Sequence, residues 1–161
     1  MTISVGERIP NTTLYHMTDD GPAAITTDEL FAGKKVALFA LPGAFTPTCS
    51  AKHLPGFVGQ ADALKAKGVD TIACLSVNDA FVMGAWAKDQ GAGDKVLLLA
   101  DGSGDLTKAL GMELDLSARG LGVRSQRYAM VVDDGKVSWL ALEENPGGLD
   151  VSSAEKVLAA L

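Results

Sequence analysis

The sequence predicts an α/β fold in which a mixed central sheet is flanked by helices. Short apolar runs typical of buried strands alternate with segments whose apolar residues recur at helical spacing. Near the C-terminus, Asp133-Asp134-Gly135 separates two apolar runs, which indicates a β-hairpin turn. No repeat, low-complexity tract or linker interrupts this order, so we expect residues 1–161 to form a single domain.

The elements can be placed in order along the chain. The expected strands are 36–41, 69–77, 95–100, 127–133 and 136–142. One expected helix carries Cys49 in its opening turn, and the others cover 79–90, 105–110 and the C-terminal residues. Alternating strands and helices that end in an antiparallel hairpin are typical of a thioredoxin-like sheet. Residues 111–125 are the least regular segment, and we expect a long loop there on the side of the functional site.

Two capping boxes predict where helices begin. Thr26 and Glu29 have the spacing of a capping box at the start of a short N-terminal helix. Ser152 and Glu155 have the same spacing ahead of the last apolar segment, so we expect Ser152 to open the C-terminal helix.

Cys49 stands at a position suited to a reactive thiolate. It follows the strand 36–41 and a turn through Pro42 and Gly43, and it precedes apolar residues at helical spacing. Thr46 and Pro47 suit the N-cap and first helical position, which places Cys49 in the opening turn of a helix. Unpaired N–H groups and the helix dipole stabilise a thiolate there. The alternative is a buried, inert cysteine that merely packs.

Thr46 also excludes one class of chemistry. It occupies the position of the first cysteine of a C-x-x-C motif, so a dithiol exchange cycle at this site is excluded. Its hydroxyl is one turn from Cys49, where it can offer a hydrogen bond to the thiolate or to a substrate oxygen.

The run 42–50, Pro-Gly-Ala-Phe-Thr-Pro-Thr-Cys-Ser, resembles the active-site signature of the peroxiredoxins, which is Pro, three residues, Thr or Ser, two residues and the reactive Cys. Further matches resemble the type II, or type-five-like, subgroup: His-Leu-Pro-Gly-Phe at 53–57, Ala-Cys-Leu-Ser-Val-Asn-Asp-Ala-Phe at 73–81 and Arg-Tyr-Ala-Met-Val-Val at 127–132. The resemblance covers essentially the whole chain.

The resemblance implies a role for each site residue. Cys49 attacks the peroxide, Thr46 and Arg127 bind and polarise it, and Pro42 packs over the sulfur to shield it from solvent and over-oxidation. An arginine beside the sulfur also favours its charged form. Spacing alone does not distinguish Arg127 from Arg119 or Arg124, and without the resemblance an ordinary surface charge is the better interpretation of Arg127.

The expected cycle ends in reduction of a sulfenic acid by another thiol. Some relatives carry a second cysteine near the C-terminus in a Gly-Leu-x-Cys-Ser setting, and Val151 stands at that position here. Cys74 lies in the middle of an apolar strand, and we expect it to be buried and unreactive. We therefore expect a one-cysteine thiol peroxidase for hydrogen peroxide and small organic hydroperoxides, recycled by glutathione and glutaredoxin. Alternatives are recycling by thioredoxin, a redox sensor or relay, and a holdase without the chemistry.

Composition indicates which binding partners, which cellular compartment and which cofactors to expect. Fourteen basic and twenty acidic residues give a net charge of -6, which argues against nucleic acid and anionic membrane as partners. No apolar stretch has membrane-spanning length and no secretory signal is visible, so we expect a cytoplasmic protein. Two cysteines are too few for a disulfide scaffold, two histidines are too few for a convincing metal site, and no cofactor is expected. Cys49 and His53 form at most half a metal site, and His53 is expected to pack or hydrogen-bond near the reactive turn.

A homodimer is also expected from the resemblance. The loop around Phe45 and the region Phe81–Trp86 lie near a dimer contact in the family. Phe81, Val82, Met83 and Trp86 have the spacing of one helix face, and ordinary core packing explains most of that face.

Overall fold

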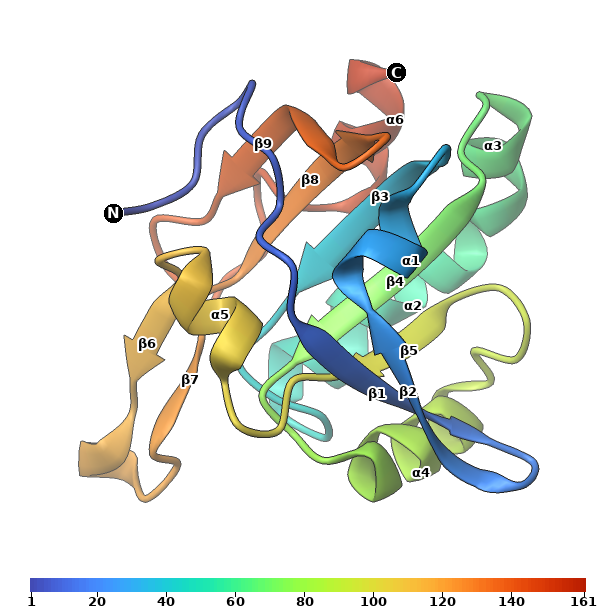
Figure 1. The fold of residues 1–161 in the computed structure, drawn as a ribbon. Helices are drawn as coiled ribbons and strands as arrows, with labels where there is room; N and C mark the ends of the chain where they lie inside the picture. Colours follow the sequence, from blue (N-terminus) through green and yellow to red (C-terminus); the bar gives the residue numbers. More distant parts are fainter.

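A seven-stranded mixed sheet runs through the centre of the computed structural model, which describes residues 1–161 (Figure 1). Its spatial order is β2-β1-β5-β4-β3-β8-β9. In chain order the strands are β1 (Thr13–Thr18), β2 (Gly21–Thr26), β3 (Lys35–Ala40), β4 (Thr71–Ser76), β5 (Leu97–Ala100), β8 (Tyr128–Asp133) and β9 (Lys136–Leu142). The three central strands β3, β4 and β5 are parallel and the outer pairings are antiparallel. The chain thus has the predicted thioredoxin-like fold with a mixed sheet.

Helices cover both faces of the sheet. They are α1 (Thr27–Phe31), α2 (Leu54–Gly59), α3 (Ala61–Ala66), α4 (Ala80–Gln90), α5 (Asp105–Ala109) and α6 (Ala154–Ala160). Side chains alternate along β3, so Phe39 packs with α2, α3, α4 and α6 on one face, while Leu38 packs with α1 and α5 on the other. Two apolar cores result, and β3 and β4 are buried on both faces.

One of the two predicted capping boxes is confirmed. The Thr26 side chain accepts from the backbone of Glu29, and the Glu29 side chain accepts from the backbone of Thr26. The Ser152 box is wrong, because Ser153 is the N-cap of α6 and accepts from the N–H of Lys156. Ser152 is instead fully buried, with its hydroxyl bonded to Glu143.

The hairpin of β1 and β2 was not expected from the sequence. β1 buries only Leu14, and β2 has no fully buried residue. Edge strands with so little burial carry no clear apolar alternation. The hairpin extends the sheet beyond β5, although β1 and β5 pair only at Tyr15 and Ala100.

Residues 111–125 are more regular than predicted. They form a second, two-stranded antiparallel sheet of β6 (Glu113–Asp115) and β7 (Val123–Ser125), joined through a 3₁₀ turn at Ser117–Arg119. Strands of three residues are too short for a periodic pattern to show in the sequence. We refer to residues 113–125 as the β6–β7 hairpin.

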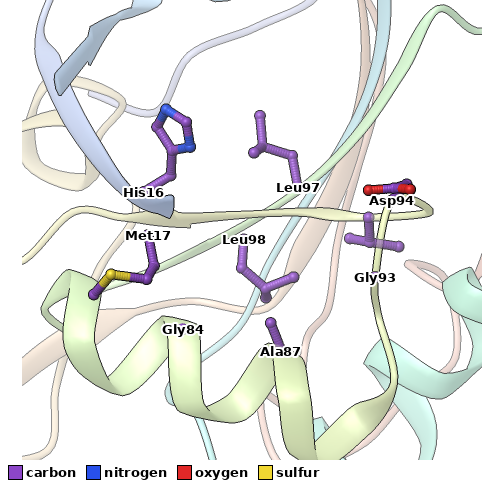
Figure 2. Close-up of a pocket in the computed structure, with 9 residues that line it drawn as sticks. His16, Met17, Gly84, Ala87, Gly93, Asp94, Leu97 and Leu98 are labelled. Atoms are coloured by element: carbon purple, nitrogen blue, oxygen red, sulfur yellow. The ribbon is translucent and has the colours of Figure 1, made fainter. Parts of the chain in front are cut away.

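A cavity lies between β1, β5 and α4 (Figure 2). His16 and Met17 on β1, Leu98 on β5 and Gly84 and Ala87 in α4 line it, and Asp94 stands on the loop that leads into β5. None of the predicted site residues lines this cavity.

Candidate active site

Cys49 lies in the first turns of the helix that follows β3, as the sequence predicts. Helical structure begins at Pro47, directly after Thr46. From Cys49 to His53 the backbone forms a π-helical turn, with the N–H of Leu54 donating to the Cys49 carbonyl. Such turns are often found at functional sites. The Cys49 side chain is fully buried.

Arg127 forms a hydrogen bond to the sulfur of Cys49. It begins the segment that leads into β8, is only 2 % exposed, and donates from Nη2 to Cys49 Sγ at 3.1 Å. Its Nε donates to the Pro146 carbonyl at 2.9 Å, and its Nη1 lies 2.9 Å from His53 Nδ1. None of these partners is a carboxylate. A buried cation favours an anion beside it, and Cys49 Sγ is the partner of Arg127 that can become one.

His53 fixes the orientation of Arg127. Its Nε2 lies 2.9 Å from the Ser152 carbonyl, which can only accept, so Nε2 carries the proton. Nδ1 is then the acceptor for Arg127 Nη1. Burial, followed by the charge of Arg127, lowers the pKa of His53 to about 3, so the imidazole is neutral at neutral pH. The expectation that His53 hydrogen-bonds near the reactive turn is confirmed.

Glu143 anchors the next layer of the network. Its Oε2 accepts from the Ser152 N–H at 2.8 Å, the Ser152 hydroxyl at 2.7 Å and the Asp150 N–H at 3.0 Å. Burial acts to raise the pKa of Glu143, but these hydrogen bonds outweigh it and hold the pKa below its ordinary value. A continuous chain of hydrogen bonds therefore runs from the sulfur to the segment 143–152.

Thr46 lies at the site with its hydroxyl directed to the backbone. Its Oγ1 donates to the Gly43 carbonyl at 2.7 Å, so its proton is not on the sulfur. The lone pairs of the same oxygen are left to accept from a peroxide. Thr46, Pro42 and Arg127 line one pocket, so the structure brings these three predicted residues together, and Arg127 connects them to the buried Cys49.

Arg124 was one of the open alternatives to Arg127, and it has a different place. Its Nε donates to the Leu121 carbonyl at 2.8 Å and its Nη1 to the Pro42 carbonyl at 3.4 Å. A Cβ at Gly43 would lie 2.8 Å from Arg124 Nη1, so this glycine leaves room for the arginine. Arg124 therefore ties the β6–β7 hairpin to the loop that carries Pro42.

Two further supports were not predicted. The side chain of Asn78, just after β4, accepts from the N–H of Ala44 at 3.0 Å. Trp86 in α4 donates from Nε1 to the Ser50 hydroxyl at 3.0 Å. Both fix the reactive turn from a neighbouring element. Asn78 lies within a matched motif, but only tertiary contact reveals its role.

The pocket above the site has a volume of about 460 Å³. Pro42, Thr46 and Arg127 line it, Arg127 being the residue that also contacts Cys49 Sγ, and Leu114, Leu116 and Leu121 line it from the β6–β7 hairpin. The third arginine, Arg119, also lines this pocket.

Cys74 is a free thiol in the core. It lies on β4, paired with Phe39 of β3, and is fully buried. Burial raises the pKa of Cys74 well above its ordinary value, with a smaller contribution from Cys49, so the thiol stays protonated. A protonated thiol is neither a nucleophile nor a good metal ligand.

No group of three or more His, Cys, Asp or Glu side chains is arranged to hold a metal ion. No helix combines the length and apolar character needed to cross a membrane.

The fold and the site together define a thiol-based redox enzyme: a thioredoxin-like sheet presents a cysteine whose sulfur is held by a buried arginine. The chain matches the Redoxin family over residues 4–158. Over 164 residues it is 56 % identical to the chloroplastic peroxiredoxin-2E of Arabidopsis thaliana, covering 99 % of this chain and 70 % of that protein. With peroxiredoxin-2D of the same plant the identity is 50 % over 160 residues, covering 99 % and 98 %.

Solved structures agree with these relatives. The reduced Prx3 of Vibrio vulnificus, determined in complex with hydrogen peroxide, superposes with a TM-score of 0.94 at 55 % identity and covers 99 % of both chains. Peroxiredoxin 5 of Alvinella pompejana superposes with a TM-score of 0.86 at 36 % identity, covering 98 % of this chain and 97 % of that one. The chain therefore belongs to the peroxiredoxins, and its function is that of a peroxidase.

Proposed function

We propose that the protein reduces hydrogen peroxide and small organic hydroperoxides through a sulfenic acid at Cys49. The observation that carries this proposal is the 3.1 Å contact between Arg127 Nη2 and Cys49 Sγ in a buried setting. A guanidinium there favours the thiolate and can also hold the peroxide oxygens as charge develops on them. The complex of Vibrio vulnificus Prx3 with hydrogen peroxide supports the same substrate.

The proposed step is a nucleophilic displacement. The Cys49 thiolate attacks the terminal oxygen of the peroxide, and an S–O bond forms as the O–O bond breaks. The sulfur loses two electrons and becomes sulfenic acid, while the leaving hydroxide or alkoxide takes a proton and departs as water or alcohol. Thr46 accepts from the peroxide, and Arg127 stabilises the negative charge that moves from sulfur to the leaving oxygen.

We further propose that glutathione, helped by glutaredoxin, returns Cys49 to the thiol. Attack by one glutathione thiolate on the sulfenic acid releases water and forms a mixed disulfide, and a second thiol releases Cys49 and oxidised glutathione. Val151 at the position of the second cysteine and the buried, protonated Cys74 both support a one-cysteine cycle. The two free cysteines also support a reducing compartment, for which we propose the cytoplasm.

Stopped-flow oxidation of the reduced protein by hydrogen peroxide tests the first step. We expect fast oxidation of one thiol, which Cys49→Ser abolishes and Cys74→Ala retains. Oxidation no faster than that of an ordinary free thiol would contradict the proposal. Circular dichroism of each variant confirms that it is folded.

Turnover then tests the reductant. We expect glutathione with glutaredoxin to sustain peroxide consumption in the wild type and in Cys74→Ala. Sustained turnover with thioredoxin alone would assign thioredoxin as the donor. A stable mixed disulfide with one protein partner, without turnover, would indicate a redox relay.

We also propose a homodimer formed through Phe45 and the start of α4. Phe45 is 54 % exposed and Phe81 is 67 % exposed, whereas Met83 and Trp86 are buried in the core. The spacing of Phe81, Val82, Met83 and Trp86 predicts one helix face that core packing mostly explains. Phe81 is the exception, because its side chain is exposed and lies outside the core. Exposed aromatic rings on adjacent elements favour an interface.

A further inference from the structure

The pocket lined by Arg127, Thr46 and Pro42 is larger than hydrogen peroxide requires. A water molecule occupies roughly 30 Å³ in the liquid, and hydrogen peroxide adds only one oxygen atom. The pocket volume of about 460 Å³ is instead in the range of pockets that take organic ligands. Substrates with a larger body than hydrogen peroxide therefore fit beside Arg127 and Thr46.

One wall of this pocket is apolar and comes from the β6–β7 hairpin. Leu114 and Leu116 are half-buried and Leu121 is 38 % exposed, so all three offer apolar surface to a ligand. Pro42 and Pro146 line the same pocket. Each methylene that a ligand buries on such a wall strengthens binding about fourfold. The wall therefore favours a hydroperoxide with a hydrocarbon body.

The charges of the pocket are both positive. Arg119 and Arg127 are the only charged residues that line it, although the chain as a whole carries a net charge of -6. The Arg127 side chain is bonded to Cys49, His53 and Pro146, whereas the exposed guanidinium of Arg119 makes no hydrogen bond within the chain. A free guanidinium beside an apolar wall is complementary to a carboxylate on an apolar molecule.

We infer that this pocket selects hydroperoxides that carry a hydrocarbon body and a carboxylate, such as hydroperoxides of fatty acids, and that Arg119 binds the carboxylate. The inference rests on the proposed peroxidase function, because Cys49 performs the same displacement and releases the corresponding hydroxy acid. Arg119 acts as a specificity residue and takes no part in the bond changes.

The test measures rate constants for Cys49 oxidation by a fatty-acid hydroperoxide and by its methyl ester, both below their micelle concentrations. We expect the wild type to react about two- to fivefold faster with the acid, the range for an exposed ion pair. Arg119→Gln is expected to bring the ratio of acid to ester to one, and Arg119→Lys to restore part of it. Because the readout is a ratio, a general effect of either substitution cancels.

Two further variants complete the design. Arg8→Gln removes the same charge at an exposed position away from the pocket, and we expect it to keep the wild-type ratio. Leu116→Ser is expected to slow the acid and the ester alike relative to hydrogen peroxide.

The outcomes distinguish a failure of the role assigned to Arg119 from a failure of the peroxidase function. An acid-to-ester ratio of one in the wild type, or an effect of Arg119→Gln on glutathione recycling alone, would overturn the assignment of Arg119. Absence of fast oxidation by hydrogen peroxide itself would instead contradict the peroxidase function.

Discussion

At the residue scale, replacing His53 should separate two roles of its imidazole, which orients Arg127 and also packs against neighbouring aromatic rings. The imidazole accepts from Arg127 and donates to Ser152, and its ring also packs against Phe39 and Phe57. His53→Phe keeps an aromatic ring but leaves Arg127 Nη1 without its acceptor. A hydrogen bond to a charged group contributes about 1.5–3 kcal/mol, so we expect oxidation by hydrogen peroxide to slow by about ten- to a hundredfold.

Two amides provide the matched controls for His53. His53→Asn carries an oxygen near the position of Nδ1 and can still accept from Arg127, whereas His53→Gln carries its amide near the position of Nε2. We expect His53→Asn to recover part of the rate that His53→Phe loses, as measured by stopped-flow fluorescence. Equal losses in His53→Asn and His53→Phe at equal melting temperatures would mean that His53 acts only through packing.

The residue scale also shows where sequence reasoning stops. Pro42, Thr46 and Cys49 lie within one short motif, so local spacing is enough to propose that they act together. Arg127 is far from them in the chain, and only the resemblance distinguished it from Arg119 and Arg124. The bonds that join Arg127 to His53, and Ser152 to Glu143, are tertiary contacts without a local signal. The Ser152 capping box failed for the same reason, because Glu143 takes its hydroxyl.

At the element scale, burial on both faces decided which strands were predictable. β3 and β4 are continuous apolar runs, and their predicted bounds lie within two residues of the observed ones. β1 and β2 bury only one residue between them and gave no signal. The predicted helix after Cys49 proved to be a π-helical turn followed by α2 and α3, because apolar spacing does not report a change of helix type.

The packing of α4 against β1 gives a second prediction. A Cβ at Gly84 would lie 2.8 Å from Met17 Cβ and 2.9 Å from Met17 Cγ, so this glycine allows the close approach seen in Figure 2. We expect Gly84→Ala to lower the free energy of unfolding by about 1–3 kcal/mol through overpacking, measured by urea denaturation.

Gly59 at the end of α2 is the matched control for Gly84. It is exposed, and a Cβ there meets no atom within 4 Å. We expect Gly59→Ala to raise the free energy of unfolding by up to about 1 kcal/mol, because alanine reduces the entropy of the unfolded chain. Destabilisation by both substitutions would show that the close contact with Met17 is not the cause.

At the scale of the whole molecule, the buried His53 should make stability depend on pH. The unfolded chain binds a proton at His53 with a pKa of 6.5, whereas the folded chain does so only at about 3. Between these values the unfolded state binds more protons, so stability falls as pH falls, by about 1.4 kcal/mol per pH unit at most for one proton. Urea unfolding between about pH 6.5 and 4.5 measures this slope.

His53→Phe provides the reference for that slope, because it lacks the titrating group and keeps every other one. Glu143, whose pKa is lowered, contributes stability of the same sign, present above its ordinary value of 4.5 and lost at lower pH. The contribution of Glu143 to the pH dependence of stability is the same in the wild type and in His53→Phe, and so cancels, if the hydrogen bonds around Ser152 are intact in both. Identical slopes in the wild type and His53→Phe would contradict a neutral, buried imidazole.

Assembly is the last property that belongs to the whole molecule. Phe45 has a φ of 62°, a left-handed conformation that is costly for an aromatic residue, and the ring is held at the surface 6.4 Å from Trp86. The exposed Phe81 and Tyr15 line one hollow at the start of α4. A strained loop that exposes an aromatic ring, together with two exposed rings at the start of α4, favours coverage by a second copy of the chain.

We therefore expect sedimentation of the wild type to show a dimer, and Phe81→Glu to shift it to the monomer, because an unpaired carboxylate in an apolar interface is costly to desolvate. Val5→Glu is the matched control, since Val5 is 59 % exposed and lies on the N-terminal segment. A dimer that survives Phe81→Glu would place the interface elsewhere, and a wild type that is monomeric at all concentrations would contradict the assembly. Since Asn78 and Trp86 connect this surface to the reactive turn, loss of the dimer should also slow Cys49 oxidation.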